Sequence, residues 1–206
     1  MIRRAAGLFV LLWILGGMAF IYFNSQNLAQ APLPILGSVG SFALTNQQSQ
    51  IFNQSQLDGK VWIANFIFTH CAGPCPMMSA VMRRFTEQLA DEEKVRFVSF
   101  SVDPVRDTPE KLRQYGEKYH ADPEKWFFLT GDRDKIYDLA LSRFRLAVGD
   151  AKPEMRSPHT ILHSTKFTLV DSKGRIRGYY DSGEPFQLKA LVRDAKRLTW
   201  EGSHDA

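Results

Sequence analysis

Cysteine occurs only twice in these 206 residues, as Cys71 and Cys75. A bridge between two residues so close in sequence would close a very short loop and would restrict little of the unfolded chain. A structural disulfide is therefore a weak explanation for the pair. The fold has to rest on an ordinary hydrophobic core, which a chain of this length with 44% hydrophobic and 23% charged residues is able to form.

A large excess of one charge is also absent. The net charge of +4 overstates the basic character of the folded part, because Arg3 and Arg4 flank an apolar segment, and without them 24 basic residues stand against 22 acidic ones. No stripe of Lys and Arg interleaved with aromatic residues occurs, so nucleic acid is not an expected partner. The sequence has no internal repeat and no long low-complexity block, and nothing in it indicates a repeat architecture.

The N-terminus carries a long apolar run. Residues 5–23 contain no charge, and these nineteen residues would make a helix of roughly 28 Å, close to the thickness of a hydrocarbon core. Arg3 and Arg4 predict that the N-terminal end stays cytoplasmic and that the rest of the chain lies outside. A cleaved signal peptide is the alternative, with residues 29–31 (Ala-Gln-Ala) as the cleavage site. The run is longer than a usual signal core, which favours an uncleaved anchor.

The expected organisation of the chain follows from this anchor. Residues 1–4 are expected in the cytoplasm, 5–23 in the membrane, 24–37 in a linker and 38–206 in one exported domain. No cysteine follows the apolar run directly, so a lipoprotein anchor is excluded. The predicted location is a bacterial inner membrane, with the domain in the periplasm.

Apolar periodicity in the exported part alternates between the patterns of strands and helices. Strands are expected at 61–68, 95–102, 126–129, 163–171 and 175–180, helices at 77–89, 107–119, 132–144 and 185–200, and a long loop at 145–160. Two short patterns, 41–44 and 50–53, are expected to pair as an N-terminal β-hairpin. The order predicts an α/β fold with a mixed sheet flanked by helices.

Both cysteines lie where a buried strand passes into a helix. The strand 61–68 ends in a short polar turn, and Pro76 fits the first turn of the helix that follows. Partial positive charge at a helix N-terminus stabilises a thiolate, so both sulfurs are expected as exposed thiolates. Their spacing is C-x-x-x-C, not the C-x-x-C of a thioredoxin-type redox site. Two soft thiolates suit Cu(I), and an added imidazole also accommodates Cu(II), so the pair is interpreted as a metal or redox site.

Five histidines could supply the imidazole: His70, His120, His159, His163 and His204. His204 lies in an expected frayed tail and His120 at the surface end of a helix, whereas the side chain of His70 should point away from the adjacent sulfur. His163 begins a strand behind a long loop that could fold over the cysteines. Near a C-x-x-x-C pair, a ligand role and a packing role for His163 remain equally open.

Two aspartates and two methionines near the cysteines have ordinary explanations. Asp107 is expected to cap the next helix, with a Glu three residues after it. Asp103 ends a strand at the carboxyl edge of the sheet, where α/β folds place their sites, and it either accepts a hydrogen bond near the cysteines or forms an Asp-Pro turn. Met77 and Met78 are soft ligands in principle, but core packing is the expected role of both.

Three ordered motifs resemble the SCO/SenC family. They are F-T-H-C-A-G-P-C-P at 68–76, S-V-D-P-V-R-D-T-P at 101–109, and H-S at 163–164 ahead of F-T-L-V-D at 167–171. The likeness covers residues 35–200, nearly all of the exported part. The family also carries an N-terminal membrane anchor, which agrees with the apolar run of this chain.

The resemblance implies a thioredoxin-like fold and a copper-binding function. Family members bind Cu(I) or Cu(II) through two cysteines and a histidine, which correspond here to Cys71, Cys75 and His163. They serve the assembly of the dinuclear copper centre in cytochrome c oxidase subunit II, so the implied partner is that subunit or a related copper-site client. A metallochaperone for one copper is expected. The alternative is a thiol–disulfide oxidoreductase that reduces the client's cysteines through Cys71 and Cys75.

Two positions depart from the family pattern. Ala72 stands where members often carry Pro after the first cysteine, and Leu162 where many carry Asp before the ligand histidine. The first change should loosen the loop slightly. The second removes a carboxylate that would orient the imidazole or guide docking. Neither change removes a ligand, and both bear on which client is served.

Overall fold

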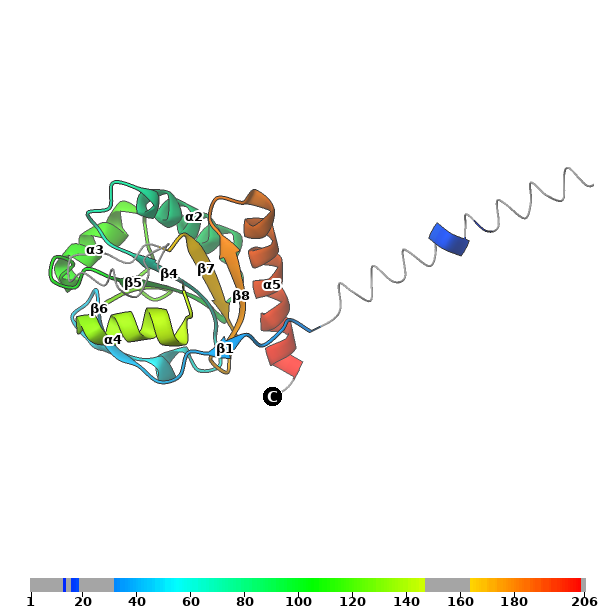
Figure 1. Ribbon diagram of the computed structural model, residues 1–206, viewed down its shortest axis with the longest axis horizontal. Helices are drawn as coiled ribbons and strands as arrows, with labels where there is room; N and C mark the ends of the chain where they lie inside the picture. Colours follow the sequence, from blue (N-terminus) through cyan, green and yellow to red (C-terminus); the bar gives the residue numbers. More distant parts are fainter. Residues whose placement is uncertain (1–12, 14–15, 19–31, 147–163, 205–206) are drawn as a thin grey trace, which may run out of the picture. The chain divides into compact units, whose positions relative to one another are not determined.

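The folded part of the chain is organised around one mixed sheet, seen in the computed structural model (Figure 1). The structure describes residues 13, 16–18, 32–146 and 164–204. The chain divides into two units, Met1–Leu33 and Pro34–Ala206, and the sheet belongs entirely to the second.

The strands follow the order β1-β8-β7-β4-β5-β6-β2-β3 across the sheet. They are β1 (Gly37–Ser38), β2 (Ala43–Asn46), β3 (Ile51–Asn53), β4 (Val61–Ile67), β5 (Val95–Ser101), β6 (Trp126–Thr130), β7 (Lys166–Val170) and β8 (Arg175–Asp181). β4, β5 and β6 are parallel, whereas β7 joins β4 and β2 joins β6 in antiparallel fashion. The predicted α/β fold with a mixed sheet is confirmed. The predicted N-terminal hairpin is present as β2 and β3.

Helices cover both faces of the sheet (Figure 1). They are α2 (Pro74–Gln88), α3 (Pro109–Lys118), α4 (Arg133–Asp138), the π-helical η2 (Leu139–Arg143) and α5 (Pro185–His204), with a 3₁₀ turn η1 (Gln54–Leu57). Phe85 of α2 packs edge-on against Phe167 of β7, with the ring centroids 5.2 Å apart. Tyr180, the partner of Phe167 across β7 and β8, donates a hydrogen bond of 2.8 Å to Asp194 of α5. α2 and α5 therefore lie on the same face.

The other face is organised by Phe144, the residue that directly follows η2. Its ring lies 6.0, 5.2 and 5.5 Å from the rings of Trp62, Phe66 and Phe100, which belong to β4 and β5. β4 is buried along all seven of its residues, because it lies between two neighbouring strands with helices above and below. The core therefore fixes the end of β4, and with it the start of the turn that carries the cysteines.

Two helices depart from their expected form. α2 begins at Pro74, earlier than the expected 77, because Pro74 and Pro76 both fit a first turn in which N–H groups lack helical partners. The helix expected at 132–144 changes to π-helix after Asp138, a local widening that a simple 3.6-residue period does not reveal.

The sheet also begins earlier than the expected domain boundary. The N–H of Leu36 donates to the carbonyl of Ile176 at 2.8 Å, and Gly37 pairs with the same residue. Both positions lie in the segment 24–37 that was expected to be a linker. A two-residue strand has too little hydrophobic pattern to be recognised in the sequence.

The expected membrane anchor, residues 5–23, falls largely outside the described residues. Trp13 and residues 16–18 are helical. Among the described residues, no helix combines the length and the apolar character needed to span a bilayer. The anchor therefore stays a prediction from the sequence.

A buried carboxylate closes the turn between β7 and β8. Asp171 accepts hydrogen bonds from the backbone N–H groups of Lys173 and Arg175 (3.0 Å each) and from the side chains of Arg175 and Arg177 (2.8 Å each). Burial disfavours the charged form of Asp171, but these hydrogen bonds outweigh it and hold the pKa of the carboxyl below its ordinary value. The end of the motif 167–171 thus has a structural role.

Phe144→Ala should lower the free energy of unfolding by about 3–5 kcal/mol, because it leaves a cavity among three aromatic rings. Denaturant unfolding of the full chain, followed by circular dichroism, measures the loss. Phe186→Ala is the matched control, since Phe186 is 67% exposed and its loss should change stability by no more than about 0.5 kcal/mol. Similar losses in the two variants would contradict the core assignment.

Asp171→Asn should be less stable than the parent at neutral pH, and the difference should shrink in acid. A carboxyl with a lowered native pKa stabilises the fold above its ordinary pKa of 3.8, and this contribution disappears as the pH falls through the lowered value. Denaturant unfolding at a series of pH values measures the difference. Asp91→Asn, at an exposed turn, is the control and should show no such trend. A constant gap between parent and Asp171→Asn would contradict the ion-pair assignment.

Candidate metal centre

The two cysteines lie in the turn that joins β4 to α2, as the sequence predicted. β4 ends at Ile67, and the N–H of Cys71 donates to the carbonyl of Phe68 at 3.2 Å, which bends the chain back after the strand. Gly73 is the residue before α2, and Cys75 is the second residue of the helix. Strand, turn and helix start therefore bring both sulfurs to one end of the sheet.

The structure corrects the expected exposure of the sulfurs. Cys71 and Cys75 are free thiols, with only 7% and 4% of their surfaces exposed, and Cys71 lies close enough to raise the pKa of Cys75. Cys75 precedes the buried residues Met78, Ser79 and Met82 at helical spacing, so it belongs to the stripe of α2 that faces the core. The sulfurs form a buried pair, not the exposed one that was expected.

Burial also reverses the expected ionisation of Cys75. Removal from water, together with the hydrogen bond and charge of Cys71, raises the pKa of Cys75 to about 12. Backbone hydrogen bonds at Phe68 and Cys75 lower the pKa by less, so the N-terminus of α2 does not produce a thiolate here. A metal that binds this sulfur has to replace a proton, and binding should strengthen as the pH rises.

A fully buried carboxylate ties the cysteine turn to the neighbouring strand. Asp107 accepts hydrogen bonds from the Thr69 N–H (3.0 Å), the Thr69 hydroxyl (2.5 Å) and the Ser101 hydroxyl (2.6 Å). Thr69 lies two residues before Cys71, and Ser101 ends β5. One side chain therefore holds together the ends of two adjacent parallel strands.

Asp107 is not the helix cap that the sequence predicted. Thr108 caps α3, because its side chain accepts from the N–H of Lys111 at 3.4 Å. An Asp just before Thr-Pro fits a cap equally well by local pattern, and the true partner of Asp107 lies 38 residues away. No local signal in the sequence could have identified this role.

Asp103 has the turn-forming role that was one of its two expected explanations. Its carbonyl accepts from the N–H of Asp107 at 2.9 Å and from the N–H of Arg106 at 3.1 Å. Its carboxylate lies 3.8 Å from the guanidinium of Arg106 at the surface. Asp103 thus shapes the segment that delivers Asp107 to the cysteine turn.

The structure describes three of the five histidines. His70 is exposed on the cysteine turn, His120 follows α3 at the surface with a positive φ of 54°, and His204 is the last residue of α5. His159 and His163 lie outside the described residues, so the predicted ligand role of His163 stays a prediction. Within the part of the chain that is described, no group of three or more His, Cys, Asp or Glu side chains is placed to hold a metal.

The two methionines after Cys75 differ in their surroundings. Met78 is fully buried, as its place on the helical stripe predicted, whereas Met77 is 48% exposed. The core-packing explanation is therefore right for Met78 and wrong for Met77. A helix stripe includes every third or fourth residue, so two adjacent residues rarely share it.

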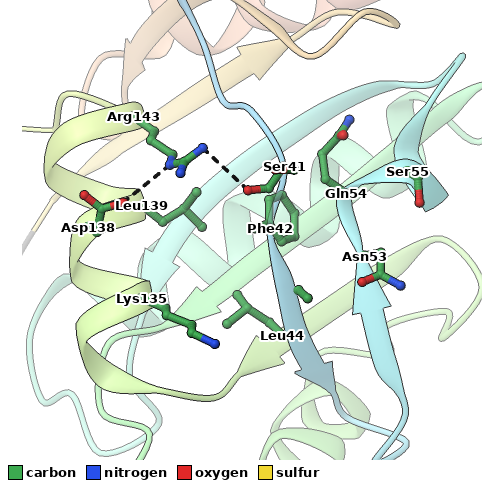
Figure 2. A pocket seen from close by; sticks show the side chains of 11 residues that line it. Ser41, Phe42, Leu44, Asn53, Gln54, Ser55, Lys135, Asp138, Leu139 and Arg143 are labelled. Carbon is green, nitrogen blue, oxygen red and sulfur yellow. Dashed lines mark hydrogen bonds and ion pairs between the residues drawn. The ribbon is translucent and has the colours of Figure 1, made fainter.

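A pocket of about 610 Å³ lies away from the cysteine turn, between the β2–β3 hairpin and α4–η2 (Figure 2). Figure 2 shows Arg143 between Asp138 and Ser41 at its rim. The guanidinium lies 3.4 Å from the carboxylate of Asp138 and donates to the carbonyls of Val39 and Ser41 at 3.3 and 3.5 Å. Arg143 therefore connects η2 to the segment that leads into β2.

Residues 36–199 match the SCO1/SenC family. The chain belongs to this family. An SCO1 protein homolog of Bacillus subtilis is 32% identical over 182 residues, which cover 87% of this chain and 92% of the relative.

Solved structures of Sco proteins share the fold. BsSco, a member of the Sco family of cytochrome c oxidase assembly proteins in which a disulfide switch was identified, matches with a TM-score of 0.69 and 33% identity, covering 81% of this chain and 96% of that one. ScoI of Bradyrhizobium japonicum, solved with copper bound, matches with a TM-score of 0.58 and 28% identity, covering 77% and 98%.

The donor set in this SCO1/SenC chain suits a soft monovalent cation. Cys71 and Cys75 place two sulfurs close together, and soft sulfur ligands select Cu(I) among the common metals. Burial limits the contact of both sulfurs with solvent. The same two free thiols can also lose two electrons and form a disulfide, so the geometry is compatible with metal binding and with thiol exchange.

Cys75 should remain a protonated thiol well above the ordinary thiol pKa of about 8.5 and should ionise only as the pH approaches about 12. Cys71→Ala should lower the pKa of Cys75, because the hydrogen bond and the charge of Cys71 both raise it. Thiolate absorbance in the ultraviolet, measured against a variant without either cysteine, follows the ionisation. A Cys75 thiolate at neutral pH in the reduced parent would contradict the burial argument.

Proposed function

We propose that this protein is a copper metallochaperone that binds one Cu(I) or Cu(II) through Cys71, Cys75 and His163. The observation that carries the proposal is the pair of free, adjacent sulfurs at the β4–α2 turn of an SCO1/SenC chain. The copper-bound ScoI structure supports copper as the cargo. The cargo is expected to pass to the dinuclear copper centre of cytochrome c oxidase subunit II or of a related client.

Binding and release follow from the chemistry of the two thiols. Each thiol has to lose its proton before it becomes a strong ligand, so copper binding releases protons and depends on pH. Cu(I) held by two sulfurs can pass to the sulfurs of a client through shared coordination, with no change in oxidation state. The buried position protects bound copper from solvent. The molecule that supplies copper and the client that receives it both have to approach the site at the surface of the turn.

The proposed setting is a membrane surface outside the cytoplasm. Residues 5–23 supply an apolar run long enough to span a bilayer, and Arg3 and Arg4 favour a cytoplasmic N-terminus. The domain, of thioredoxin-like fold, would then work in a bacterial periplasm from a single anchor. A tether of this kind keeps the metallochaperone close to a membrane-bound client.

A thiol–disulfide oxidoreductase is the second candidate. The adjacent free thiols favour it, and the disulfide switch reported for BsSco supports it. In this reaction Cys71 and Cys75 give two electrons and two protons to a client disulfide, which becomes a dithiol while the pair becomes a disulfide. Reduction would prepare the client's cysteines for copper, so the two functions are compatible.

Titration of the reduced full chain with Cu(I) in competition with a chelator tests the proposal. The parent should bind about one copper per chain, and Cys71→Ser or Cys75→Ser should lose tight binding, because soft sulfur ligands dominate Cu(I) affinity. X-ray absorption should show sulfur neighbours in the parent. Affinity no tighter than micromolar would contradict the proposal.

The role of His163 separates the two candidates. His163→Ala should remove a nitrogen ligand from the electron paramagnetic resonance spectrum of the Cu(II) form and leave thiol exchange intact. His120→Asn is the matched control, because His120 is exposed and Asn tolerates its positive φ. If His163→Ala retains full function in cells and a thiol-exchange defect alone abolishes it, the oxidoreductase becomes the main function.

A further inference from the structure

The imidazole of His70 lies at the surface of the cysteine turn, directly before Cys71. Its side chain is 52% exposed, whereas the side chain of Asp107 beside it is fully buried. His70 Nδ1 and Asp107 Oδ1 are 3.9 Å apart, and the hydroxyl of Thr69 bridges them at 3.0 and 2.5 Å. A surface imidazole is thus linked to a buried carboxylate through one hydroxyl.

This bridge sets the tautomer of His70. A carboxylate only accepts hydrogen bonds, so the Thr69 hydroxyl uses its single proton on Asp107 Oδ1. The contact between Thr69 Oγ1 and His70 Nδ1 then requires Nδ1 to be the donor. Nε2 of the neutral ring carries a lone pair, and no hydrogen bond from residues 32–146 or 164–204 occupies it.

The bridge is anchored on both sides of Thr69. Asp107 Oδ2 accepts from the Thr69 N–H at 3.0 Å and from the Ser101 hydroxyl at 2.6 Å, while Oδ1 receives the Thr69 hydroxyl. Backbone and side chain of Thr69 are therefore fixed by the same carboxylate. A histidine whose one ring nitrogen is held by a carboxylate, directly or through a polar group, has its other nitrogen oriented and made more basic for a metal.

The imidazole of His70 is accessible at the surface, whereas the two sulfurs are buried. Cys71 and Cys75, at 7% and 4% exposure, offer little surface to an incoming copper complex. We propose that His70 Nε2 is a further copper ligand, which takes up the metal at the surface before it passes to the two sulfurs. Asp107 is the positioning residue for His70. This inference rests on the proposed copper-binding function and adds a transient ligand that acts before Cys71, Cys75 and His163 hold the metal.

Uptake of this kind involves no electron transfer. Cu(I) arrives as a complex with small thiol ligands, one of which leaves as the copper–nitrogen bond to Nε2 of His70 forms. As copper–sulfur bonds to Cys71 and Cys75 then form, the remaining small thiol ligand leaves, both cysteine thiols release their protons to solvent, and the bond to Nε2 breaks. The metal remains Cu(I) throughout.

The orientation of His70 can be measured without copper. NMR of the reduced full chain with isotopically labelled histidine rings should show the His70 ring protonated at Nδ1, and loss of the signal in His70→Gln assigns it. Thr69→Val removes the hydroxyl at constant size and should abolish the preference, whereas Thr69→Ser should keep it. A His70 ring protonated at Nε2 in the parent would overturn the inference.

The ligand role can be measured by the rate of copper uptake. The reduced full chain is mixed rapidly with a Cu(I)–thiol complex, and the sulfur-to-copper absorbance is followed. His70→Gln should slow uptake several-fold but leave the number of bound copper ions and the equilibrium affinity close to the parent. Asp107→Asn should slow it by no more than His70→Gln does, because Asp107 acts only through the orientation of that ring. His120→Asn is the matched control and should behave as the parent.

The Thr69 pair keeps the test decisive if Asp107→Asn fails to fold. Thr69→Val should slow uptake and Thr69→Ser should not. If the two variants are equally stable to heat, a bridge that only stabilises the fold would not produce this difference in uptake rate. Equal uptake rates for the parent and His70→Gln, with one copper bound by each, would overturn this inference alone. A parent that binds no copper would overturn the proposed function together with it.

Discussion

The cysteine turn depends on the buried carboxylate of Asp107. Its hydrogen bonds with Thr69 and Ser101 connect the end of β4 to the end of β5, at the edge of the sheet where both strands terminate. Hydrogen bonds to a charged group are stronger than neutral ones, and a buried carboxylate that loses its donors carries a large desolvation penalty. The turn between Thr69 and Cys75 therefore has one favourable conformation, which sets the positions of the two cysteines.

The core supplies the rigidity on which this arrangement rests. β4 is buried throughout and packs on one face against Phe144, so its last residue cannot shift without repacking several aromatic rings. The same packing places Cys75 on the inner stripe of α2. The sulfurs are thus buried because of the way in which α2 docks. Metal binding is therefore controlled by the access of copper to the sulfurs and by the loss of the thiol protons.

The departures from the SCO/SenC pattern fall at different distances from this framework. Ala72 is exposed in the cysteine turn, between residues that are already fixed by Thr69 and by α2. The neighbouring bonds of Asp107 limit how far the turn can loosen. Leu162 lies outside the described residues, so its effect on His163 stays a prediction. This chain lacks the carboxylate that many family members carry at the position of Leu162, but His70 is linked through Thr69 to the carboxylate of Asp107.

Local patterns in the sequence determined much of this protein: the alternation of strands and helices, the β2–β3 hairpin, and the cysteines at a strand-to-helix junction. These features depend on residues a few positions apart, where periodicity and proline are informative. Only the tertiary structure decided that the sulfurs are buried, that Met77 is exposed, and that Asp107 binds Thr69 instead of capping α3. Each of these depends on how elements far apart in the chain dock against one another, because burial and long-range hydrogen bonds leave no periodic trace in the sequence.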